Sequence, residues 1–198
     1  MRNTLIAVLV ALLVGAGATG WIMTRGTAGT RIDASRDAVV KEMRSLGRLE
    51  TSSFSIEKII EAKKEGGGPW SDILFGDKLL LIASGEVVAG YDLGGLSKDD
   101  FEQVGTGLRV KLPAPQIFSV RLDNEKTRVY DRDQGLLARG DKDLESEARL
   151  AAEQSIREAA CAAGILGEAR ENAIKQIGAL LGALGFPDSV VQSPSGSC

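Results

Sequence analysis

The sequence predicts an α+β protein with an N-terminal membrane helix, a mostly antiparallel sheet of about five strands and a C-terminal helical hairpin. Three observations support this fold class. Residues 5–23 carry no charge. Short apolar runs separated by turn-forming residues fill residues 50–130. From residue 141 onward, apolar residues recur at helical spacing. Strands followed by helices are typical of the α+β class.

The membrane helix is predicted for residues 5–23, which begin with Leu5 and end with Met23. At about 1.5 Å per residue, this segment matches the roughly 30 Å of hydrocarbon in a bilayer. We expect an uncleaved single-pass anchor, because apolar residues resume at Trp21 after a stretch of small residues. The alternative is a secretory signal peptide cleaved near Ala18, where the A-x-A pattern is met.

Both interpretations send the rest of the chain out of the cytoplasm. The positive-inside rule favours the opposite side, because Arg25, Arg31, Arg36 and Lys41 follow the segment and only Arg2 precedes it. A short Arg-led start before a long apolar run is nevertheless the usual export signal. We therefore expect the bacterial cell membrane as the location and an extracytoplasmic body.

The chain is expected to divide into four parts: anchor 1–23, linker 24–31, α+β domain 32–190 and flexible tail 191–198. The domain should open with a helix over residues 32–46. Asp33 or Ser35 can cap its start, and Gly47 can end it.

The first strand is predicted over residues 50–62, where Phe54, Ile56 and Ile60 share one face. A glycine-rich loop follows at residues 63–69. The apolar run over 78–93 indicates a buried strand with a bulge, or a tight hairpin broken near Gly85.

Three further strands are expected after a turn over residues 94–100. They lie at residues 101–112, 116–122 and 127–130, and the short connections favour an antiparallel meander. Two helices then follow, with a turn at Gly164 to Gly167 and a stop at Pro187.

Composition excludes several function classes. The whole chain carries a net charge of −3, and no acidic residue precedes Asp33, so the body is more acidic than the chain. Such a body repels phosphate backbones, which argues against nucleic-acid binding. The absence of histidine excludes Ser-His-Asp and Cys-His mechanisms. The two cysteines are interpreted as a small core residue, Cys161, and a loose terminal thiol, Cys198.

The sequence offers one weak candidate for a metal site. Residues 131–135 resemble the start of a calcium loop, but Gly135 and Lys142 occupy positions where an EF-hand needs oxygen ligands. Asp123, Asp131 and Asp133 could still gather at one end of the sheet and hold a hard cation weakly. We expect a solvated acidic turn instead, and no metal or cofactor.

Two motifs raise the possibility of hydrolysis. Ser55 and Lys58 match S-x-x-K, but this serine falls in a predicted strand and the companion motifs are missing. Glu86 and Asp92 could form a pair of glycosidase carboxylates. A small domain with 5% aromatic residues offers few surfaces for sugar stacking, so we expect no enzyme.

Three stretches carry a resemblance to a known family: LLLIASGEVVAGYDLGGL, LRVKLPAPQIFSVRLDNEKTRVYDRDQGLL and ARLAAEQSIREAACAAGILGEARENA. In this order they resemble the bacterial family called domain of unknown function 4230. The resemblance covers about residues 49–186. It implies an envelope-associated protein with a membrane segment, and it supplies no catalytic residue.

The sequence therefore predicts a membrane-anchored envelope protein that acts as a non-enzymatic interaction or scaffold module. The body would contact another protein or a second copy of the chain. The alternative is a small-ligand or lipid-binding module with a pocket between sheet and helices. A carboxylate-based hydrolase is the remote alternative.

Overall fold

The computed structural model describes residues 35–64, 68–138 and 140–198. These residues belong to one compact unit, Ala34–Cys198. The predicted anchor, the linker over 24–31 and the cap candidate Asp33 lie outside the described residues. Among the residues that are described, no helix combines the length and apolar character needed to cross a bilayer.

A long antiparallel hairpin forms the frame of the unit. Strand β1 (Arg48–Lys64) pairs with β2 (Asp77–Asp92) over the full length of both strands. The predicted strand over 78–93 is therefore one continuous strand, and the alternative of a tight hairpin near Gly85 is wrong. A Cβ at Gly85 would lie 2.8 Å from both Ile156 Cδ1 and the carbonyl oxygen of Arg121, so the glycine lets neighbouring elements approach.

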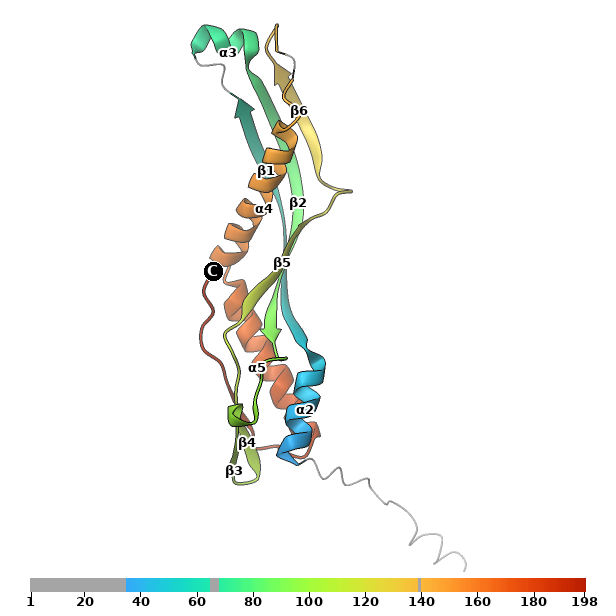
Figure 1. Ribbon diagram of the computed structural model, residues 1–198, viewed down its shortest axis with the longest axis vertical. Helices are drawn as coiled ribbons and strands as arrows, with labels where there is room; N and C mark the ends of the chain where they lie inside the picture. The colour runs from blue at the N-terminus through green and yellow to red at the C-terminus, as the bar shows by residue number, and fades with distance from the viewer. Residues whose placement is uncertain (1–34, 65–67, 139) are drawn as a thin grey trace, which may run out of the picture. The chain divides into compact units, whose positions relative to one another are not determined.

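The other edge of β2 is occupied by two strands in succession. Strand β5 (Gln116–Leu122) pairs with residues 85–90, and β6 (Arg128–Gln134) pairs with residues 77–82 (Figure 1). The predicted meander is wrong at this point, because both strands pair with β2 and run in the same direction. Thr127 fixes the break between them by hydrogen bonding the backbone of Ser84.

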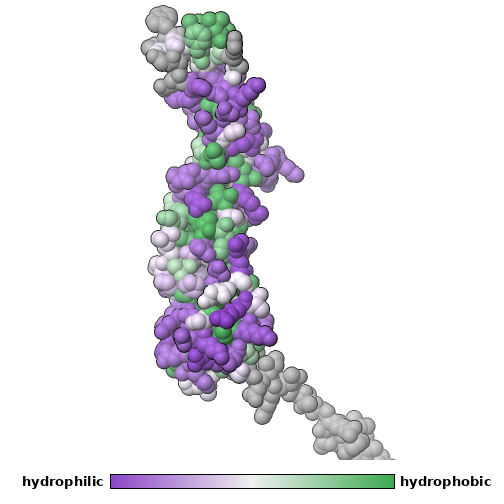
Figure 2. Space-filling view, in the orientation of Figure 1, coloured by the Kyte–Doolittle hydropathy of each residue, from purple (hydrophilic) through white to green (hydrophobic). Residues whose placement is uncertain are grey.

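Strand β1 shows the alternation that its sequence predicts. Phe54, Ile56 and Ile60 are half-buried toward the helices, whereas the odd-numbered residues between them are exposed. Hydrophilic side chains cover much of the face shown in Figure 2, with hydrophobic ones between them. The sheet therefore has one covered face and one solvated face, as antiparallel sheets often do.

The two predicted C-terminal helices are confirmed as α4 (Leu144–Ala162) and α5 (Ile165–Ala183). They do not fold back as a hairpin. Instead they follow each other along the sheet, with Gly164 at the joint in the left-handed region at φ 82° (Figure 1). Their buried residues meet successive parts of β2 in three core clusters. Leu144 and Ala148 lie with Leu79 and Leu81, Ile156 and Ala160 lie with Val87 and Ala89, and Ile177 and Leu181 lie with Tyr91 and with Leu93, which directly follows β2.

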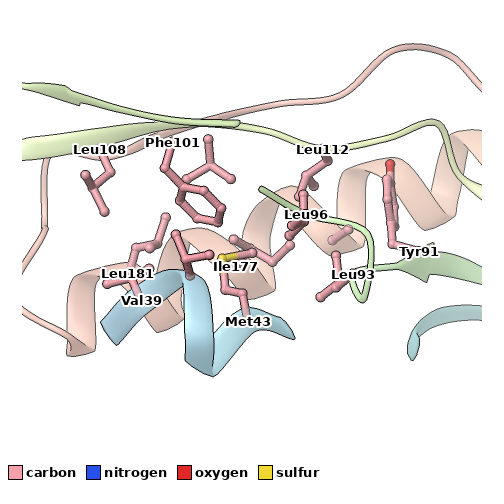
Figure 3. Close-up of a cluster of buried hydrophobic side chains, with 13 residues drawn as sticks. Val39, Met43, Tyr91, Leu93, Leu96, Phe101, Leu108, Leu112, Ile177 and Leu181 are labelled. Atoms are coloured by element: carbon pink, nitrogen blue, oxygen red, sulfur yellow. The ribbon is translucent and has the colours of Figure 1, made fainter. Parts of the chain in front are cut away.

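The largest of these clusters lies at the end of β2 that carries Asp92. Helix α2 (Arg36–Leu46) places Val39, Val40 and Met43 in it (Figure 3). Ser35 caps the helix and Gly47, at φ 62°, ends it, as predicted.

A small second sheet covers the same cluster. It consists of β3 (Phe101–Val104), β4 (Gly107–Lys111) and β7 (Val190–Gln192), in the order β3-β4-β7. The single strand predicted over 101–112 is wrong, because Gly105 turns the chain at φ 62° and creates a hairpin. A short 3-10 helix, η1 (Lys98–Asp100), precedes β3.

The C-terminal residues are attached to the body. Residues 190–192 form β7, which pairs with β4 in parallel. The hydroxyl of Tyr91 and Oγ of Ser193 are 2.7 Å apart and hydrogen bonded. Cys198 forms a disulfide with Cys161 across 37 residues of sequence. The loose terminal thiol expected from the sequence is therefore wrong, and residues 191 and 192 of the predicted tail belong to β7.

Candidate functional site

The end of the β1–β2 hairpin opposite to α2 is built from two connecting segments. Helix α3 (Pro69–Phe75) follows β1 and precedes β2 in the sequence, and the segment that follows β6 packs against it. Gly135 N donates to the carbonyl oxygen of Gly76 at 2.8 Å, and Leu137 N donates to that of Leu74 at 2.8 Å. A Cβ at Gly135 would lie 2.6 Å from the carbonyl carbon of Leu74, so a side chain there would push the segments apart.

These two segments expose large apolar side chains. The exposed fraction is 59% for Ile73, 52% for Phe75, 84% for Leu136 and 61% for Leu137. We call these four residues the apolar tip. Figure 2 shows hydrophobic atoms gathered at the end of the unit that carries α3. A concentration of exposed apolar side chains of this kind usually marks an interaction site.

A buried ion pair holds the base of the apolar tip. The Asp77 side chain is only 3% exposed and accepts hydrogen bonds from Arg132 Nε at 3.0 Å and Nη2 at 2.6 Å. It also accepts a bond from the backbone N–H of Asp141 at 2.7 Å, while Arg132 Nη2 donates to the carbonyl oxygen of Asp141 at 2.6 Å. The pair therefore joins β2, β6 and the segment before α4.

The charges around this pair are matched. The Arg132 guanidinium holds the pKa of Asp77 below its ordinary value, in opposition to burial of the carboxyl group. Asp141 is paired with Lys64. The Lys64 ammonium group lowers the pKa of Asp141, and the Asp141 carboxylate raises the pKa of Lys64. The base of the tip is thus ionised and paired near neutral pH, which suits a rigid support.

Two cavities lie beside the apolar tip. One has a volume of about 500 Å³, and its lining includes Ile73 and Leu136 together with Lys63, Lys64 and Lys78. The other has a volume of about 330 Å³ and is lined partly by Phe75, Lys64 and Lys142. Each cavity combines apolar tip residues with lysines.

The three aspartates named as a weak metal candidate do not gather at one place. Asp131 and Asp133 lie opposite Leu80 and Lys78 on β2, while Asp123 lies beside Ser84, in the turn before β6. At about 3.3 Å per strand residue, Asp123 is more than 10 Å along the sheet from the other two. Asp123 is instead paired with Lys126 at 3.1 Å. In the part of the chain that the structure describes, no group of three acidic, histidine or cysteine residues could hold a metal ion.

The two hydrolase motifs are also separated. Glu86 and Asp92 stand six residues apart on one strand, so about 20 Å separates them, compared with the roughly 5–9.5 Å that glycosidases use. Ser55 and Lys58 point to opposite faces of β1, because they are an odd number of positions, three, apart along the strand. Lys58 Nζ instead bonds the hydroxyl and carbonyl oxygens of Ser155 on α4, at 3.0 and 3.1 Å.

A comparison with known protein families gives a match over nearly all of the described unit. The sequence model of a family described as protein of unknown function, DUF4230, matches residues 41–191. The chain belongs to this family. The match begins within α2 and ends within β7, so the DUF4230 region includes both sheets, both long helices and the apolar tip. No curated protein and no solved structure is similar enough to count as a match.

The DUF4230 match agrees with the resemblance seen in the sequence, although it assigns no activity. The apolar tip was missed by sequence reasoning. Its signal was nevertheless present, since Ile73, Phe75, Leu136 and Leu137 are large apolar residues in segments adjacent to Gly76 and Gly135.

Proposed function

We propose that this chain is a membrane-anchored, extracytoplasmic and non-enzymatic interaction module whose binding surface is the apolar tip. The main support for this proposal is that the four apolar tip residues are exposed at one end of the unit, above the buried ion pair of Asp77 and Arg132. Burying a Leu, Ile or Phe side chain contributes about 1.5–3 kcal/mol, so leaving four of them in water favours a partner at this end.

The position of the tip suits such a role. Helix α2, the first described element, packs at the end of β2 that carries Asp92, and the tip lies beside Asp77 at the other end. Sixteen strand residues span about 50 Å. A body attached through its N-terminus would therefore hold its binding surface far from the attachment point.

Two features support the membrane anchor and the outward side. The uncharged segment from Leu5 to Met23 is long enough to span a bilayer. The Cys161–Cys198 disulfide is of a kind that forms and persists in oxidising compartments outside the cytoplasm.

The location can be tested by trapping thiols in intact cells with an alkylating agent before lysis. We expect Cys161 and Cys198 to resist alkylation unless a reductant is added first, and the full-length chain to remain in the membrane fraction. Two freely alkylated thiols in the native chain would contradict the extracytoplasmic side.

The binding role can be tested with a photo-crosslinking amino acid at Leu136 in the full chain. Leu150 is the matched control, because it is 67% exposed on α4, away from the tip. We expect crosslinked products from position 136 that are absent from position 150, and their loss on substitution L137S. Identical products from both positions, or no product with either protein or lipid from 136, would remove the tip as the binding surface.

A further inference from the structure

The apolar tip has a composition and size that specify the kind of partner. The exposed fractions of its four residues correspond to roughly 500 Å² of surface, close to the largest apolar patch of an ordinary monomer. A stable protein dimer uses about 800 Å² from each partner. Tip-to-tip contact between two copies would therefore fall short of a stable interface.

The tip residues project outward from connecting segments. Leu136 is 84% exposed and Ile73 is 59% exposed, so more than half of each residue stays in contact with solvent although both line the same cavity. Projecting aliphatic and aromatic side chains are suited to entering the boundary between the headgroups and acyl chains of a bilayer.

Lysines surround these side chains. Lys63, Lys64 and Lys78 line one cavity with Ile73 and Leu136, and Lys142 lines the other with Phe75. The lysine side chains are substantially exposed, for example 60% for Lys63 and 65% for Lys64. Lys64 is bound by Asp141, and Lys63 and Lys78 lie 4.0 and 3.2 Å from Oε1 of Glu61. Because these lysines are exposed, such surface pairs are weak, and the ammonium groups can exchange a carboxylate for a lipid phosphate while the stems lie along apolar surface.

The carboxylates in the same region are mostly paired within the protein. Asp77 is bound by Arg132, and Asp141 is bound by Lys64. Asp133 is the remaining carboxylate that lines these two cavities. The tip is therefore less acidic than the body as a whole, which lowers repulsion from anionic headgroups.

From these observations we infer that the apolar tip binds a lipid bilayer surface. The inference rests on the proposed function and names the occupant of the same surface. Ile73, Phe75, Leu136 and Leu137 enter the headgroup boundary, and the lysines contact phosphates. Replacing one tip leucine by serine should weaken this contact about tenfold or more, from the free energy of burying that side chain.

The test uses the full chain with a fluorescent label on an introduced cysteine, L136C, since the native cysteines are joined in the disulfide. The labelled chain is mixed with vesicles of phosphatidylethanolamine and phosphatidylglycerol that carry a quencher attached to the lipid chains. L150C, labelled in the same way, is the control. We expect strong quenching at 136, little at 150, and loss of quenching at 136 when F75S and L137S are added.

Equal quenching at both positions, or none at 136, would overturn the lipid assignment. Crosslinking of a protein at position 136 without quenching there would overturn it as well, but would leave the interaction role of the tip in place. Absence of both quenching and crosslinking at 136 would remove the tip as a binding surface altogether.

Discussion

Substitution of Asp77 by Asn should destabilise the tip end of the molecule. The carboxylate accepts three hydrogen bonds, two of them from Arg132, and is almost completely buried. Hydrogen bonds to charged groups contribute about 1.5–3 kcal/mol each when fully desolvated. Because the Arg132 side chain is 29% exposed and can be hydrated, we expect a total loss of about 2–3 kcal/mol.

The effect should depend on pH in one direction. The folded-state pKa of Asp77 lies below its ordinary value of 3.8, because Arg132 stabilises the charged form. Its stabilising contribution is therefore complete above about pH 5, where the carboxyl group is ionised in both states, and is lost as the pH falls through the lowered value. The difference between the native chain and D77N should be constant between about pH 5 and pH 7 and should shrink on further acidification.

Urea unfolding of the full chain in a mild detergent, followed by far-ultraviolet circular dichroism, measures this difference. D133N is the matched control, because Asp133 is an exposed carboxylate next to Arg132 in sequence, and its effect should stay within about 0.5 kcal/mol. If D77N were as stable as D133N, or if its deficit persisted at acidic pH, the described role of the ion pair would be refuted.

Two further changes test other parts of the fold. The double variant C161S/C198S should lower the free energy of unfolding by about 3–4 kcal/mol, because the disulfide closes a loop of 37 residues; a reductant should affect only the native chain. G90A should cost about 2–4 kcal/mol, because its Cβ would lie 2.0 Å from the carbonyl oxygen of Leu49, whereas G95A, with open space around it, should be nearly neutral in the same urea titration.

Local patterns in the sequence were sufficient for most individual elements. The alternation of Phe54, Ile56 and Ile60 identified β1, and Ser35 with Gly47 delimited α2, because exposure and capping act within a few residues. Relations between elements were harder to predict. The spacing of buried residues in α4 and α5 is the same whether the helices fold back or run on, so it could not exclude the hairpin.

The candidate site depended on contacts between distant segments. Ile73 and Leu136 lie far apart in sequence and come together only because β6 returns along β2 to α3. The pairing of Cys161 with Cys198 has the same origin, since two cysteines 37 residues apart show no proximity in the sequence. The weak metal candidate made of Asp123, Asp131 and Asp133 shows the converse: these residues are close in sequence, but Asp123 lies at Ser84 and the other two lie opposite Leu80 and Lys78.

The end-to-end placement of α4 and α5 along β2 links strand length to helix length. A strand advances about 3.3 Å per residue and a helix about 1.5 Å, so each residue added to β2 requires roughly two in the helices. The 16 residues of β2 and the two helices of 19 residues each follow this ratio. A longer or shorter body therefore requires insertions or deletions in β2 and in the helices together, and the length of the body changes in these matched steps.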